Sequence, residues 1–124
     1  PWRRPTSRTS RGSGSRAVVA DADLLTSAMA FTHVVTFKWN DGGFDSSEIA
    51  TSLRELVSGF DGLIGYRCGA DAGVTPGAYD FAVVATFEDQ QSFVAYRDHP
   101  EHQRILSEMI LPNLQVRTVV QLQD

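Results

Sequence analysis

Residues 31–39 read FTHVVTFKW, a run made mostly of β-branched and aromatic side chains. Residues of these types are typical of β-strands. The run stops at residues 40–43, Asn-Asp-Gly-Gly, which form a cluster of turn residues. We therefore expect a first strand over residues 31–39.

The segments after this strand have helical and strand patterns in turn. Asp45 and Glu48 have the spacing of a capping box, and the apolar residues of one helix face follow: Ile49, Leu53, Leu56, Val57 and Phe60. Residues 63–69 and 79–87 have strand patterns on either side of a loop. In the first of these strands Ile64, Tyr66 and Cys68 should share one face.

Asp89 is placed to cap a second helix, and Pro100 should interrupt it and open a further helix that stops at Pro112. A fourth strand is predicted over residues 114–122. Its Val116, Val120 and Leu122 are expected to face inward.

The predicted order of elements is β-α-β-β-α-β, which indicates an α+β, ferredoxin-like fold with a four-stranded antiparallel sheet. The strands over 31–39 and 79–87 are apolar on both faces, as befits the central pair. Two helices cover only one face of such a sheet. We expect the odd-numbered, aromatic-rich row of these two strands, which runs from Phe31 to Trp39 and from Tyr79 to Phe87, to stay uncovered. A second copy packed sheet to sheet would bury it, so a homodimer with a barrel cavity is predicted.

Composition and charge narrow the class of protein. The 124 residues suit one domain, and Cys68 is the single cysteine, so no internal disulfide forms. No apolar run is long enough to span a membrane, and a cytoplasmic location is expected. Residues 29–124 carry one Lys and five Arg against thirteen carboxylates, a net charge of −7. Such an acidic body argues against nucleic-acid binding.

Residues 1–28 differ from the rest of the chain. They are rich in Arg, Ser, Thr and Gly, with a net charge of +3. This composition predicts a flexible N-terminal extension. Met29 leads directly into the first strand, so the extension is interpreted as upstream sequence or a cloning addition, and residues 29–124 as the domain.

Three groups of residues resemble the stress-responsive A/B barrel (Dabb) family, the dimeric α/β-barrel proteins. They are the stretch from Met29 to His33, the strand from Tyr79-Asp80 to Phe87, and above all residues 96–102, Tyr-Arg-Asp-His-Pro-Glu-His. The resemblance implies a ferredoxin-like protomer, a sheet-to-sheet dimer and a pocket between sheet and helices. Plant polyketide cyclases of the family use a tyrosine and the last histidine of this motif, which here correspond to Tyr96 and His102.

We therefore predict Tyr96 and His102 as catalytic residues, with His33 as a further pocket residue. A histidine takes up and returns a proton near neutral pH, and a tyrosine hydroxyl donates to a developing enolate. Each also has a structural reading: Tyr96 can pack on its helix, and a strand histidine such as His33 can be a satisfied core residue. For His99 the structural reading, a cap before Pro100, is favoured.

The histidines and Glu101 lack the spacing of a zinc site, and no phosphate-binding loop is present, so no metal and no cofactor is expected. The predicted function is binding of a small hydrophobic or aromatic molecule in the barrel cavity, with cofactor-free acid/base chemistry of cyclase or lyase type. One alternative is a non-catalytic, stress-associated dimer. Another is an enzyme similar to antibiotic-biosynthesis monooxygenases, which the motif over residues 96–102 disfavours.

Overall fold

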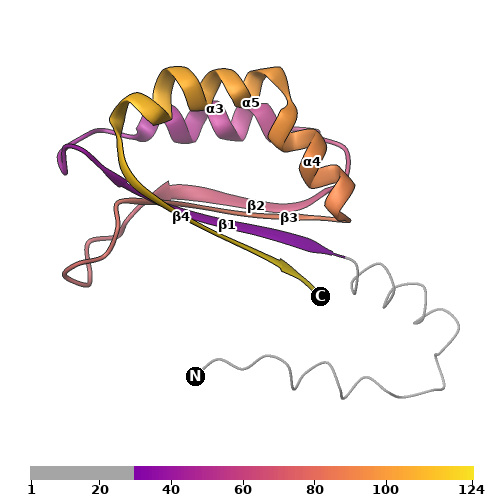
Figure 1. Ribbon diagram of the computed structural model, residues 1–124, viewed down its shortest axis with the longest axis horizontal. Coiled ribbons are helices and arrows are strands. Elements are labelled where there is room, and N and C mark those ends of the chain that lie inside the picture. Colours follow the sequence, from indigo (N-terminus) through magenta and orange to yellow (C-terminus); the bar gives the residue numbers. More distant parts are fainter. Residues whose placement is uncertain (1–29) are drawn as a thin grey trace, which may run out of the picture.

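The computed structural model describes residues 30–124. The predicted extension over residues 1–28 and its boundary at Met29 lie outside the described residues. Element labels are those of Figure 1. The elements are β1 (Phe31–Trp39), α3 (Ser47–Val57), β2 (Leu63–Ala70), β3 (Phe81–Phe87), α4 (Gln90–Asp98), α5 (Pro100–Ile105) and β4 (Leu114–Gln123). A π-helical segment (Leu106–Ile110) and a 3-10 turn (Leu111–Asn113) join α5 to β4.

The four strands form one antiparallel sheet in the order β2-β3-β1-β4. The predicted ferredoxin-like arrangement, with β1 and β3 in the centre, is confirmed. Helices α3, α4 and α5 all lie on one side of this sheet, as Figure 1 shows, and no helix of residues 30–124 covers the other side.

The side of the sheet that the helices cover is the opposite of the predicted one. The odd-numbered row of β1 and β3 is buried under the helices, and Phe37, Trp39, Phe81 and Phe87 are each at most 3% exposed. The physical reason is size: the aromatic row offers far more apolar area to the helices than the Val, Thr and Ala residues of the even-numbered row. Burial of that larger area therefore decides which face becomes the core.

The helix-free face is still apolar, but it is built from other residues. Val34 of β1 lies opposite Val84 and Val120, which are 39% and 55% exposed. Leu122 and Val116 continue the row at 51% and 36%. The expectation that Val116, Val120 and Leu122 point inward to the core is therefore wrong for a single chain.

Local details differ from prediction at two places. At the start of α3, Ser46 takes the cap position without a side-chain hydrogen bond, and Asp45 instead accepts from the Ser47 amide at 3.0 Å, so the capping box is not formed. In β2 a bulge after Leu63 shifts the register, and Ile64 is 56% exposed while Tyr66 and Cys68 pack against the core.

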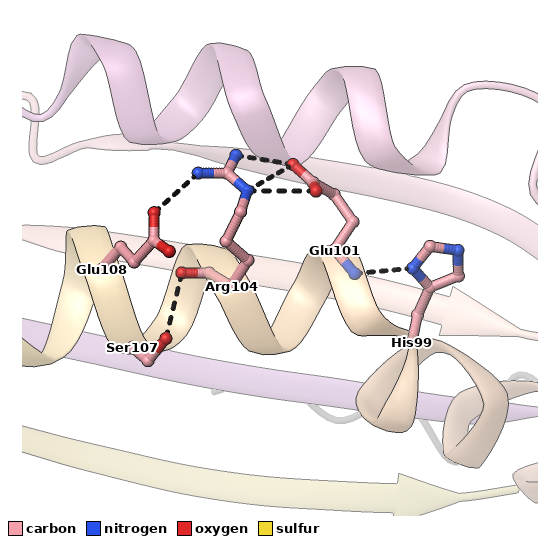
Figure 2. A network of polar contacts seen from close by, with 5 residues as sticks. All are labelled: His99, Glu101, Arg104, Ser107 and Glu108. Carbon is pink, nitrogen blue, oxygen red and sulfur yellow. Dashed lines mark hydrogen bonds and ion pairs between the residues drawn. The ribbon is translucent and has the colours of Figure 1, made fainter.

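The break between α4 and α5 matches the sequence expectation. Asp89 caps α4 by accepting from the Ser92 amide at 2.8 Å. At the other end His99 leaves helical geometry, and its Nδ1 accepts from the Glu101 amide at 3.0 Å, as Figure 2 shows, with Pro100 at the first position of α5. The predicted capping role of His99 is confirmed.

Candidate functional site

A cavity of about 180 Å³ lies between the helix-facing side of the sheet and the helices. His33 from β1, Tyr96 from α4 and His102 from α5 all line it. The structure thus brings the three sequence-predicted residues together on one cavity. This cavity belongs to the helix side of a single chain, whereas the prediction from the exposed aromatic row placed it between two sheets.

The α4–α5 break positions the two motif residues against each other. Tyr96 is buried at 2% exposure on the last turn of α4. Because the chain turns at His99 before re-entering a helix, His102 comes back over Tyr96, with ring centroids 4.4 Å apart. A continuous helix would place residues six apart on different faces.

The ring of His102 has a defined tautomer. Its Nδ1 lies 3.0 Å from the Arg97 carbonyl oxygen, which only accepts, so Nδ1 carries the hydrogen and donates it. Nε2 is then the unprotonated acceptor. Burial lowers the pKa of His102 below 6.5, while the hydrogen bond to the Arg97 carbonyl opposes this shift. The residue is therefore a neutral base that the carbonyl would stabilise once it is protonated.

Tyr96 is held by a second tyrosine that the sequence analysis did not single out. The hydroxyls of Tyr96 and Tyr66 lie 2.9 Å apart, and both side chains are largely buried. Burial raises the pKa of Tyr96 to about 12 and raises that of Tyr66 further. Because a tyrosine hydroxyl has one donor and two acceptor sites, Tyr96 can accept from Tyr66 and still donate its own hydrogen.

His33 lies on the opposite wall, on the strand. Its ring packs on Phe93 with centroids 4.8 Å apart, and its Nδ1 accepts from the Gln121 side-chain amide of β4 at 3.2 Å. Burial, followed by the nearby charges of His102 and Arg117, lowers the pKa of His33 to about 4. It is therefore neutral at pH 7, with its hydrogen on Nε2.

Three polar residues of the cavity wall were missed by sequence reasoning: Arg97, Arg117 and Gln121. Arg117 and Gln121 pair with Phe37 and His33 across the β1–β4 ladder, so they share the helix-facing side. The alternation of β4 places Arg117 and Gln121 on one face of the strand. The prediction that Val116, Val120 and Leu122 face the core assigned these two polar residues to the outer face, so they were missed.

The remaining candidates lie elsewhere. His99 does not line the cavity, and Glu101 is paired with Arg104 at 2.6 Å on the outer side of α5, where Arg104 also contacts Glu108 (Figure 2). Within residues 30–124 no group of three or more His, Cys, Asp or Glu side chains is placed to hold a metal ion. In the same part of the chain, no helix is long and apolar enough to cross a membrane.

The residues 96–102 that resemble the Dabb family contribute Tyr96 and His102 to this cavity. The cavity is lined by aromatic residues, and His33 adds a second neutral imidazole. Residues 31–124 match the stress responsive A/B barrel domain, and the chain belongs to this family. No curated protein matches the chain.

Solved structures agree on the fold. A dimeric ferredoxin-like protein of unknown function from Thermobifida fusca is 38% identical, with a TM-score of 0.70 over 77% of this chain and 92% of that one. A Dabb protein from Mesorhizobium loti is 18% identical, with a TM-score of 0.62 over 75% and 94%. The hydroxynitrile lyase of Passiflora edulis is 15% identical, with a TM-score of 0.62 over 77% and 93%.

Proposed function

We propose that the protein binds a small aromatic or hydrophobic molecule that carries a carbonyl or hydroxyl oxygen. We further propose that it catalyses a proton transfer on this molecule without a cofactor. The observation that carries this proposal is the convergence of Tyr96, His102 and His33 on one cavity. A dry apolar cavity of about 150 Å³ is enough to hold benzene, so a volume of about 180 Å³ suits a single aromatic ring with small substituents.

The roles follow from the hydrogen bonds. His102 Nε2 takes a proton from the carbon next to the ligand's carbonyl, and the Arg97 carbonyl stabilises the imidazolium through Nδ1–H. The Tyr96 hydroxyl donates to the enolate oxygen that develops, and the hydrogen bond from Tyr66 holds the Tyr96 hydroxyl in position. The Nε2–H of His33 orients the ligand from the strand side. The proton then returns from His102 to product.

A cyclase-like condensation begins with removal of a proton from the carbon next to a carbonyl, whereas cleavage of a hydroxynitrile begins with removal of the hydroxyl proton as cyanide leaves; a neutral imidazole base serves either step. The Passiflora edulis protein is named a hydroxynitrile lyase, and at 15% identity it supports this proposal only as an example of the fold in a lyase.

The proposal includes a homodimer. The helix-free face carries a row of half-exposed Val and Leu side chains with no cover from residues 30–124. The similar Thermobifida fusca protein is described as dimeric. Sheet-to-sheet packing of two copies would bury this row.

A second candidate is a non-catalytic dimer, in which the apolar helix-free face is the functional feature and the cavity is only a packing defect. The observation that favours this candidate is the exposure of Val120 and Leu122, at 55% and 51%. A dimer built on these side chains would not need Tyr96 or His102. The two candidates differ in whether the cavity residues do chemistry.

The test is deuterium exchange on small aromatic methyl ketones, such as 4-hydroxyacetophenone, followed in D₂O by loss of the methyl proton signal. We expect the protein to accelerate exchange over buffer and His102→Gln to lose at least about 100-fold of that acceleration. The matched control is His99→Asn, which keeps a capping side chain outside the cavity and should retain activity. Equal rates in the wild type and His102→Gln would reject the catalytic role and favour the non-catalytic dimer.

A further inference from the structure

The charged side chains that line the cavity are all of one sign. Residues 30–124 contain thirteen Asp and Glu, yet none of the described residues that line the cavity is acidic. The charged side chains on its wall are Arg97 and Arg117. In a body with a net charge of −7, a cavity bordered only by cations is a local reversal of sign.

The two arginines are not equivalent. Arg97 is already paired with Asp98, at 2.9 Å between Nε and the carboxylate. Arg117 makes no ion pair with any residue in 30–124, and it lies on the helix-facing side of β4, opposite Phe37. It lines the cavity together with His33, and its charge contributes to the lowered pKa of that histidine.

The histidines add no positive charge at neutral pH. His33 has a pKa of about 4, and burial holds the pKa of His102 below its ordinary value. Arg117 is therefore the unpaired fixed cation of the described cavity wall. The inner wall beside it is aromatic, with Phe37 and Phe93 lining the same space.

We infer that the ligand is a small aromatic acid whose carboxylate pairs with Arg117 at the cavity mouth while its ring enters between Phe37 and Phe93. This inference rests on the proposed function and specifies its ligand class. A guanidinium binds a carboxylate through two parallel hydrogen bonds, which fixes the orientation of the ring as well as adding affinity. The ring substituents would then face Tyr96 and His102.

The experiment compares 4-hydroxybenzoate with 4-hydroxybenzamide, which has nearly the same shape and no charge, by calorimetric or NMR titration at pH 7. We expect the acid to bind about tenfold more tightly than the amide. Arg117→Gln should remove about that tenfold preference and leave amide binding within about twofold. The control is Arg104→Gln, which removes the same charge from an arginine outside the cavity and should preserve the preference.

The outcomes distinguish failure of this inference from failure of the proposed function. Acid preference that is lost in Arg117→Gln and kept in Arg104→Gln supports the inference. Equal binding of acid and amide, or equal loss in both variants, overturns the carboxylate assignment and leaves the cavity as a binding site for neutral ligands. Failure of both compounds to bind overturns the inference together with the proposed aromatic ligand.

Discussion

At the scale of single residues, His33 is a polar side chain in a largely apolar environment that still offers a hydrogen-bond donor to the cavity. It occupies a central strand among buried aromatic residues, its Nδ1 accepts from the Gln121 amide, and its ring packs on Phe93. Burial keeps the ring neutral. The consequence is a histidine that serves the cavity as a neutral hydrogen-bond donor across the physiological pH range.

His33 also makes stability depend on pH in a defined direction. Its pKa is about 4 when folded and 6.5 ordinarily, so below pH 6.5 the unfolded chain takes up a proton that the folded chain refuses. The free energy of unfolding should be highest above pH 6.5 and fall as pH drops toward 4. Urea denaturation at several pH values measures this, and His33→Gln should flatten the slope. An unchanged slope in that variant would remove His33 as the cause.

The hydroxyl pair of Tyr66 and Tyr96 gives a second prediction. Tyr66→Phe leaves the Tyr96 hydroxyl buried without its partner, which costs about 1–3 kcal/mol of unfolding free energy. Chemical denaturation measures the loss. Tyr79→Phe is the control, because the Tyr79 hydroxyl makes no hydrogen bond with a described residue, and it should stay within about 0.5 kcal/mol of the wild type. Equal losses in the two variants would contradict the pairing.

Sequence reasoning found the site residues of the motif but not their supports. Tyr96, His102 and His33 stand out because their side-chain types suit proton transfer. Tyr66 meets Tyr96 only through folding, since the two are 30 residues apart. Arg117 was visible as a residue of alternating β4, and the wrong choice of face hid it.

At the scale of elements, the close approach of α4 to the start of β2 depends on Gly62. Gly62 has a φ of +84°, and a Cβ built on it would lie 2.2 Å from the Ser92 hydroxyl and 2.7 Å from the Ser92 Cβ. Its carbonyl also accepts from the Glu88 amide at 2.8 Å. The close contact sets α4, and with it Tyr96, against the end of the sheet.

Gly62→Ala should therefore destabilise the fold by more than the left-handed backbone alone explains. The control is Gly77→Ala, which has a φ of +87° and no atom within 4 Å of the added Cβ. We expect about 1–2 kcal/mol for Gly77→Ala and at least about 1 kcal/mol more for Gly62→Ala, measured by denaturation. Adding Ser92→Gly to Gly62→Ala should recover part of the difference. Equal costs at the two glycines would show that the contact with Ser92 is not limiting.

The order and type of elements were predictable because each has a local cause: a capping Asp89, a break at Pro100 and period-2 strands. The covered face of the sheet was not predictable from alternation alone, because β1 and β3 are apolar on both sides. Comparing the two rows by side-chain volume would have favoured the aromatic row as the core, because the larger apolar area gains more from burial.

At the scale of the whole molecule, the helix-free face predicts self-association. Val120→Glu places a charge on the helix-free face, which a sheet-to-sheet dimer would bury. The dissociation constant of the dimer should rise at least about 100-fold in this variant, as judged by sedimentation. The control is Val74→Glu, in the β2–β3 loop at 83% exposure, which should remain dimeric. A wild-type monomer, or a dimer that Val120→Glu leaves intact, would reject this interface.

The central claim is that one cavity joins Tyr96, His102 and His33 around a small aromatic ligand. The chain contains three histidines, and only His33 and His102 line that cavity, so their ring signals report on it while His99 serves as an internal reference. The measurement is an NMR titration of the three rings with 4-hydroxybenzoate. We predict saturable shifts of His33 and His102 with one common dissociation constant and an unchanged His99. Shifts of neither cavity histidine, or separate constants for the two, would contradict the claim.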